Sequence, residues 1–250
     1  MPSTQFILKK LGKRFINTRH FDRILQITGC QTVHCLGDSH TEIFRYIAGN
    51  YLWFHTRFKF CVVQGASGMG LANPKSKTNA LSVFKTYIKP LPRNEGIIFC
   101  LGEVDCGFVI WYRAQKYGVS IEEQFELSLR NYLSFVDYAK LQGFETILIL
   151  SAPLPTIIDN QDWGEVAQLR RDVKATLRQR TDLTMKYNER LRSYSQKKGY
   201  IFLDIEKDIL DSKERVIAER FRHPDPLNHH LNEKPTAQLL IPYLKSYGYW

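Results

Sequence analysis

The most regular feature of the sequence is a set of short, almost uninterrupted apolar runs. Polar stretches of very different length separate them. The runs are TVHCLG (32–37), KFCVVQ (59–64), GIIFCLG (96–102), TILILSAP (146–153) and YIFLDI (200–205). Successive side chains of a strand point to opposite faces, so an uninterrupted apolar run predicts a strand that is covered on both faces, as in a parallel sheet.

The segments between these runs repeat apolar residues at helical spacing. The predicted helices cover 41–49, 77–89, 121–142, a stretch that places Leu183, Tyr187, Leu191 and Tyr194 on one face, and 233 to about 247. Alternation of strand and helix predicts an α/β fold with right-handed crossovers. We therefore expect a three-layer α/β/α sandwich around a mainly parallel, five-stranded sheet, doubly wound as in flavodoxin.

Composition supports one folded domain and adds a strong basic bias. A chain of 250 residues, 44% of them hydrophobic, can bury a sizeable core and is too apolar for disorder. We expect one domain over 31–250, preceded by a basic extension over 1–30. The net charge of +10 favours anionic partners. Residues 1–25 hold six basic groups and one acid, and residues 170–198 hold ten basic groups and three acids.

Two interpretations are open for each basic segment. Leu8, Leu11 and Phe15 lie at helical spacing among lysines and arginines. This pattern indicates either an amphipathic helix packed on the domain or a segment that docks on an anionic membrane surface. The stretch 170–198 indicates either a solvated helix face or a surface for an anionic glycan or nucleotide-linked donor. It carries no nucleic-acid-binding motif, so nucleic acid is not an expected partner.

The cysteines and the N-terminus favour a cytoplasmic protein, with peripheral membrane attachment through residues 1–25 left open. The five cysteines include no CxxC pair, and three lie in apolar runs, which is typical of reduced, buried thiols. The first residues are basic but lack the apolar core of a signal peptide. No stretch reaches the length of a transmembrane helix.

Four polar segments follow predicted strands and carry complementary chemistry. They are GDSH (37–40), QGASGMG (64–70), LGEVDC (101–106) and HPDPLNHHLN (223–232). Ligands of a doubly wound sheet bind beyond the carboxyl ends of its strands, so these segments should converge on one rim. A serine hydroxyl becomes a nucleophile when a histidine takes its proton, and an aspartate can orient that histidine. The segments therefore predict a serine-based site.

Plainer interpretations exist for the same residues. Ser39 could be only the N-cap of the following helix. Glu103 and Asp105 could bind a metal ion or cap a turn. Imidazole and carboxylate ligands in the late segment could also form a metal site, although no H-x-x-x-H pattern or cysteine accompanies them. These late residues are His223, Asp225, His229 and His230.

Taken in order, the four blocks resemble those of the SGNH/GDSL hydrolases. The resemblance covers roughly residues 32–245 and has no counterpart for the N-terminal basic segment. It implies that Ser39 is the nucleophile and that its N–H is one oxyanion donor. It implies Gly68 as a second donor, with Gly70 as the alternative register, and makes Asp105 a structural hydrogen-bond acceptor. The residues expected to line the site are Asp38, His40, Glu103 and Asp105.

The late block implies His230 as the base, with His229 as the alternative, and Asp225 as the acid that orients it. Two positions depart from the family pattern. Val104 stands where the third block, Gly-x-Asn-Asp, has its asparagine, and valine cannot donate a hydrogen bond to an oxyanion. Asp225 lies five residues before His230 instead of three. The GEVDC block resembles a bacterial branch of the superfamily.

The function that this resemblance implies is a serine esterase acting through an acyl-enzyme on O-acyl esters. Acetyl esters, carried by a carbohydrate, are the expected substrates. No metal or organic cofactor is expected. An O-acyltransferase with the same site is one alternative, and a non-catalytic module that binds a glycan or an acidic partner is the other.

Overall fold

The computed structural model describes residues 30–161, 171 and 173–249 of the chain. Residues 1–29 of the basic extension, with the predicted amphipathic helix, lie outside the described residues. Within the described residues, no helix combines the length and the apolar character needed to cross a membrane. All five cysteines are free thiols, and Cys35, Cys61, Cys100 and Cys106 are buried, as predicted.

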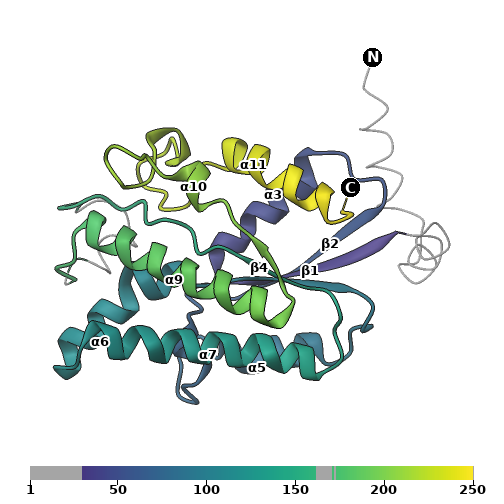
Figure 1. The fold of residues 1–250 in the computed structure, drawn as a ribbon, viewed down its shortest axis with the longest axis horizontal. Helices are drawn as coiled ribbons and strands as arrows, with labels where there is room; N and C mark the ends of the chain where they lie inside the picture. Colours follow the sequence, from purple (N-terminus) through teal and green to yellow (C-terminus); the bar gives the residue numbers. More distant parts are fainter. Residues whose placement is uncertain (1–29, 162–170, 172, 250) are drawn as a thin grey trace.

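The centre of the molecule is a five-stranded, wholly parallel sheet in the order β2-β1-β3-β4-β5 (Figure 1). The strands are β1 Gln31–Gly37, β2 Thr56–Val62, β3 Gly96–Cys100, β4 Ile147–Leu150 and β5 Ile201–Leu203. Every residue of β3 and β4 is buried, because helices cover both faces of the sheet. The predicted three-layer, flavodoxin-like α/β fold is confirmed.

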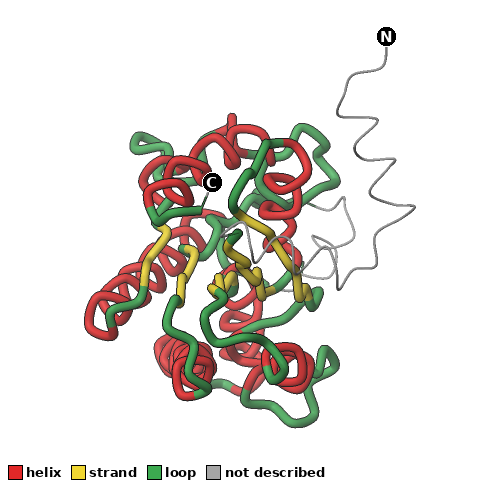
Figure 2. The backbone as a smooth tube through the Cα atoms, turned by 90° about the vertical axis from the view of Figure 1, so that its right-hand side faces the viewer, coloured by secondary structure: helices red, strands yellow, loops and turns green. Residues whose placement is uncertain are grey.

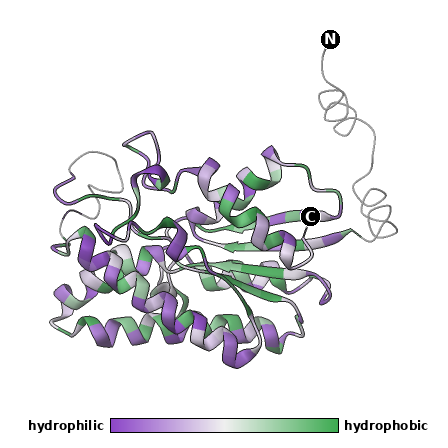
Figure 3. Cartoon of the chain, turned by 45° about the horizontal axis from the view of Figure 1, so that its top comes forward, coloured by the Kyte–Doolittle hydropathy of each residue, from purple (hydrophilic) through white to green (hydrophobic). Residues whose placement is uncertain are grey.

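Two helical layers enclose the sheet (Figure 2). On one face, α3 (Glu42–Asn50) and α11 (Glu233–Ser246) pack on an apolar cluster that includes Val33 and Leu148. The other face carries α5 (Ala80–Ile88), α7 (Ile121–Leu141) and α9 (Leu177–Lys198). The strands are largely hydrophobic, whereas the outer helix surfaces are largely hydrophilic (Figure 3). Burial of these two apolar clusters is the main favourable term in forming the fold.

At the rim that should hold the site, two strands end earlier in the structure than the sequence predicted. β3 ends at Cys100 and β4 at Leu150, whereas the apolar runs continue to residues 102 and 153. Burial continues past both ends, so the sequence pattern does not reveal where the ladder stops. These extra residues form the loops that carry Glu103 and Pro153.

Several short elements were not predicted, and most of them lie around the same rim. They are η1 Ser39–Thr41, α4 Gly68–Leu71, the π-helical turn η2 Asp105–Val109, α6 Ile110–Tyr117, α10 Glu206–Ile209 and η3 Glu219–Phe221. Except for α6, these elements have three to five residues, which is too short to display helical periodicity, and tertiary contacts determine them instead.

The basic stretch of α9 is partly neutralised by acids on neighbouring elements. Lys186 pairs with Glu122 of α7 at 2.5 Å, and Arg192 pairs with Asp204 after β5 at 2.6 Å. These ion pairs lie at or near the surface, so each contributes little stability. They favour the interpretation of this stretch as a solvated helix face, and a surface for an anionic glycan or nucleotide-linked donor stays a prediction.

Gly37 ends β1 at a point where no side chain fits. A Cβ atom there would lie 1.9 Å from the carbonyl oxygen of Cys100 and 2.5 Å from Thr41 Oγ1. The amide of Asp38 donates to the same carbonyl oxygen at 3.2 Å. The bare backbone of Gly37 therefore lets the chain pass close to the end of β3 and turn directly into Asp38 and Ser39.

The Gly37→Ala substitution should lower the free energy of unfolding by at least about 3 kcal/mol, because overlap with a backbone oxygen exceeds ordinary overpacking. Gly49→Ala is the matched control, since a Cβ atom at this position of α3 meets nothing within 4 Å. Alanine there should be neutral or stabilise the helix by about 0.5–1 kcal/mol. Urea unfolding of both variants measures the difference, and equal stabilities would contradict the steric argument.

The carboxylate of Asp105 joins three elements below the rim. It is fully buried and accepts hydrogen bonds from the amides of Gly68 (2.7 Å) and Met69 (3.0 Å) at the start of α4. It also accepts the hydroxyl of Ser128 in α7 at 2.7 Å. Burial raises the pKa of Asp105 to about 6, against the opposing effect of these donors. Asp105 therefore has the structural role that the sequence resemblance implied.

Asp105→Asn should lower the free energy of unfolding at pH 7 by about 1–3 kcal/mol, because an amide NH₂ would face a backbone N–H. The folded wild type binds a proton more tightly than the unfolded chain, whose aspartate has a pKa of about 3.9. Acidification from about pH 6 to pH 4 should therefore stabilise the wild type relative to the variant.

Chemical unfolding between pH 4 and pH 7 measures this difference, with the exposed Asp208→Asn as control. A gap between wild type and Asp105→Asn that narrows on acidification would contradict the assigned direction of the pKa shift.

Candidate active site

Ser39 lies directly after β1, in the turn η1 that leads into α3. The N-cap of this turn is Asp38, whose carboxylate accepts the amide of His40 at 2.8 Å. No side chain caps α3 itself. The interpretation of Ser39 as a helix N-cap is therefore wrong, and its partly exposed hydroxyl has no capping role.

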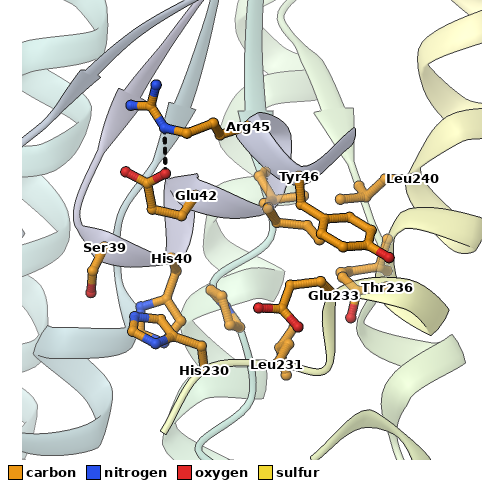
Figure 4. Close-up of a pocket in the computed structure, with 14 residues that line it drawn as sticks. Ser39, His40, Glu42, Arg45, Tyr46, His230, Leu231, Glu233, Thr236 and Leu240 are labelled. Atoms are coloured by element: carbon orange, nitrogen blue, oxygen red, sulfur yellow. Dashed lines mark hydrogen bonds and ion pairs between the residues drawn. The ribbon is translucent and has the colours of Figure 1, made fainter. Parts of the chain in front are cut away.

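The loop that carries the late histidines is fastened at both ends. An antiparallel bridge joins Arg222 to Leu231. Thr156, in the loop after β4, contacts this loop twice. Its Oγ1 donates to the carbonyl oxygen of His229 at 2.5 Å, and the Arg222 guanidinium donates to its carbonyl oxygen. These bonds hold the loop 222–231 against the loop after β4. They bring His230 to the cavity that Ser39 also lines (Figure 4).

Asn228 fixes the orientation and the tautomer of His230. One atom, Asn228 Oδ1, lies 2.9 Å from the amide nitrogen of His230 and 2.8 Å from its Nδ1. Because the backbone N–H must donate, this atom is an acceptor, and Nδ1 carries the ring proton. His230 Nε2 is buried and has no hydrogen-bond partner among the described residues. Its lone pair is therefore available to accept a proton.

The surroundings of His230 favour the neutral imidazole. Burial, together with the neighbouring His40 and His229 rings, lowers the pKa of His230 to about 3. Asn228 orients the ring without supplying a negative charge to stabilise the protonated form. The ring is therefore correctly oriented for general-base chemistry but is a weak base in this state of the site.

Asp225 is not the acid that orients His230, which corrects the prediction. The Asp225 side chain is exposed and accepts the amide of Leu227 at 2.9 Å, while its backbone contacts the ring of His223. The loop uses Asp225 to shape its own turn, and Asn228, two residues before His230, takes the orienting role. Asn228 was not predicted, because the orienting residue was expected to be a carboxylate.

Two of the predicted oxyanion donors are also corrected. The amide of Gly68 donates to Asp105 Oδ2 at 2.7 Å, and the amide of Gly70 donates to Ser67 Oγ at 3.0 Å. Val104 is buried and offers no donor. Among the described residues, the amide of Ser39 has no acceptor, so it is the one predicted donor that the structure leaves available.

His40 brings a third imidazole and two buried carboxylates to the site. Its Nδ1 lies 3.1 Å from Asp38 Oδ1, and its Nε2 lies 3.9 Å from Glu103 Oε2. The centroid of its ring lies 4.8 Å from that of His230 and 5.7 Å from that of His229. Asp38, His40 and Glu103 thus lie beside the predicted nucleophile, as expected.

The only group of described residues that could hold a metal ion is His40, His229 and His230. It differs from the metal alternative considered from the sequence. His40 belongs to this group, whereas His223 and Asp225 do not. The His223 imidazole instead lies 3.5 Å from Glu233 Oε2.

Beside Ser39 and His230 lies a cavity of about 410 Å³ between α3, α11 and the ends of β4 and β5 (Figure 4). Its lining is mostly apolar, and the cavity was not predicted because its apolar residues have the same pattern as core residues. The apolar lining residues are Ile43, Leu150, Pro153, Ile205, Leu231 and Leu240. The exposed ion pair between Glu42 and Arg45 lies at its edge. The site can therefore accept an apolar group next to the serine.

No protein-family model matches the chain, and no curated protein matches its sequence. Solved structures do resemble it. A GDSL-like lipase from Bacteroides thetaiotaomicron has 14% identity and a TM-score of 0.55, with 87% of this chain and 88% of the other covered. A protein assigned as an acylhydrolase from Bacteroides fragilis has 14% identity and a TM-score of 0.54, with 87% of each chain covered.

A protein assigned as an SGNH hydrolase from Slackia heliotrinireducens has 12% identity and a TM-score of 0.50, with 88% of this chain and all of the other covered. At such identities the likeness concerns the backbone. The chain has the α/β fold of the SGNH/GDSL hydrolases.

Proposed function

We propose that this protein is a serine esterase that works through an acyl-enzyme. The observation that carries the proposal is the buried, unpartnered Nε2 of His230, which Asn228 holds in the proton-accepting tautomer at the cavity lined by Ser39. A serine becomes nucleophilic when such a base lies nearby. The shared fold of the GDSL-like lipase is further support.

The reaction that these residues would perform is acyl transfer in two steps. His230 Nε2 takes the proton of Ser39 Oγ as the oxygen attacks the ester carbonyl, and the amide of Ser39 donates to the developing oxyanion. The ester C–O bond then breaks, and the leaving alkoxide takes the proton from His230. In the second step, water attacks the acyl-enzyme carbonyl while His230 takes its proton. The ester bond to Ser39 Oγ then breaks, Ser39 regains its proton from His230, and the acid is released.

Two features of the site predict slow turnover. The amides of Gly68 and Gly70 are engaged elsewhere, and loss of one oxyanion donor costs about 2.7–4 kcal/mol in transition-state stabilisation. Asn228 is neutral and does not stabilise the imidazolium as a carboxylate would. We therefore expect an esterase with a low kcat.

The cavity favours an ester with an apolar acyl chain of several carbons. Its volume of about 410 Å³ exceeds what an acetyl group needs, and apolar walls gain free energy only from apolar contents. The acyl group is thus proposed to extend between Ile43 and Leu240. A carbohydrate as the alcohol part stays a prediction from the sequence.

Hydrolysis of p-nitrophenyl butanoate tests the proposal. Ser39→Ala and His230→Ala should reduce turnover to background, and Ser39→Ala should abolish labelling by a fluorophosphonate. Asn228→Ala should lower kcat by about 10-fold or more, since the base loses its fixed orientation. Asp225→Ala is the matched control from the same loop and should keep most of the activity. Absence of both turnover and labelling in the intact protein would refute the esterase.

A series of p-nitrophenyl esters from acetate to octanoate tests the acyl cavity. kcat/KM should rise by up to about 4-fold per methylene until the cavity is filled, from about 0.8 kcal/mol per buried CH₂. Leu240→Phe should shift the optimum to shorter chains. Leu239→Phe, on the same helix but outside the cavity lining, should leave it unchanged. Preference for acetate in all three proteins would exclude this cavity as the acyl site.

A further inference from the structure

We propose that His40, His229 and His230 form a binding site for one transition-metal ion, of which Zn²⁺ is the best fit, and that the ion blocks the catalytic base. The binding half of this proposal stands on the geometry alone. The inhibitory half rests on the proposed esterase function.

The three imidazoles converge from two separate parts of the chain. One ring nitrogen from each lies within 4.8 Å of the other two. His229 and His230 have ring centroids 4.1 Å apart, and the His40 ring lies 5.7 Å from the first and 4.8 Å from the second. Tetrahedral zinc with Zn–N bonds of about 2.0–2.1 Å needs nitrogens about 3.4 Å apart, a contraction that small side-chain rotations supply.

Hydrogen bonds already orient two of these rings as metal ligands. Asp38 lies against Nδ1 of His40, and Asn228 lies against Nδ1 of His230. In His230, Nε2 is consequently the nitrogen that carries the lone pair, and it is buried without a partner among the described residues. Ligand histidines usually have this kind of oxygen partner on the other nitrogen, which fixes the tautomer and the direction of the lone pair.

The charges around the cluster also favour a cation. The carboxylates of Asp38 and Glu103 are both buried, and both lie against His40. Nε2 of His230 is buried without a partner among the described residues. Burying a polar nitrogen without a hydrogen bond is costly, and a metal ion bound there would remove that cost. No thiol belongs to the cluster, so its ligand set is wholly imidazole.

Metal binding and catalysis use the same pair of electrons. The Nε2 lone pair of His230 either accepts the proton of Ser39 or coordinates the ion, so the two states exclude each other. Zn²⁺ should therefore inhibit the esterase, and a chelator should restore it fully.

Calorimetric titration of the chelator-treated full chain with ZnCl₂ tests the site directly. We expect one equivalent to bind, and His40→Gln and His229→Gln should each weaken binding by about 10-fold or more. His55→Gln removes a histidine near the opposite end of the sheet, before β2, and should change nothing. Co²⁺ should give the visible absorption of a tetrahedral nitrogen site without the charge-transfer band of a thiolate ligand. Binding that none of the cluster variants weakens would overturn the proposal.

An activity assay separates this proposal from the esterase. If the protein hydrolyses esters, ZnCl₂ should inhibit the wild type at concentrations that match the Kd measured by calorimetry. The His229→Gln substitution should raise the inhibitory concentration of ZnCl₂ by the same factor as it raises the Kd for Zn²⁺. Inhibition that stays equal in His229→Gln and the wild type would refute the blocking mechanism. If no ester is hydrolysed but the cluster variants still weaken binding, the esterase fails and the metal site stands.

Discussion

The buried carboxylate of Asp105 is the interaction on which the geometry of this site depends. A carboxylate in the interior needs several donors, and the chain supplies two amides of α4 and the hydroxyl of Ser128. Those bonds hold α4 against α7 so closely that a Cβ atom on Gly68 would lie 2.7 Å from the carbonyl oxygen of Ser128. The same bonds direct the Gly68 amide toward Asp105. The scaffold therefore occupies an N–H group that the proposed esterase would otherwise have available for the oxyanion.

The layers of the fold were predicted well, because each main helix and strand repeats its apolar pattern over several residues. Helix 121–141 and the strand that begins at Gly96 each carry several apolar residues whose burial the fold requires. Right-handed crossovers then leave only a few possible strand orders. Strand ends were less accurate, since Leu101 and Ala152 stay buried after the ladder has stopped.

The residues of the site were predicted less completely, and the reason is local. Ser39 and His230 were predicted from the segments GDSH and HPDPLNHHLN. The role of a loop residue depends instead on the conformation of the loop backbone, which these segments do not predict. In the loop between the bridged residues Arg222 and Leu231, Asn228 contacts the imidazole of His230, whereas Asp225 accepts the amide of Leu227. The direction of the Gly68 amide is likewise a property of backbone geometry, which residue type does not encode.

A histidine directly after the candidate nucleophile changes what the base can do. His40 cannot turn away freely, because Asp38 holds both its amide and its ring. Its ring is therefore fixed close to that of His230, where a proton on one disfavours a proton on the other. A metal ion escapes this repulsion, since it binds three neutral rings through their lone pairs. The convergence of the three rings is thus the geometric basis of the proposed metal site.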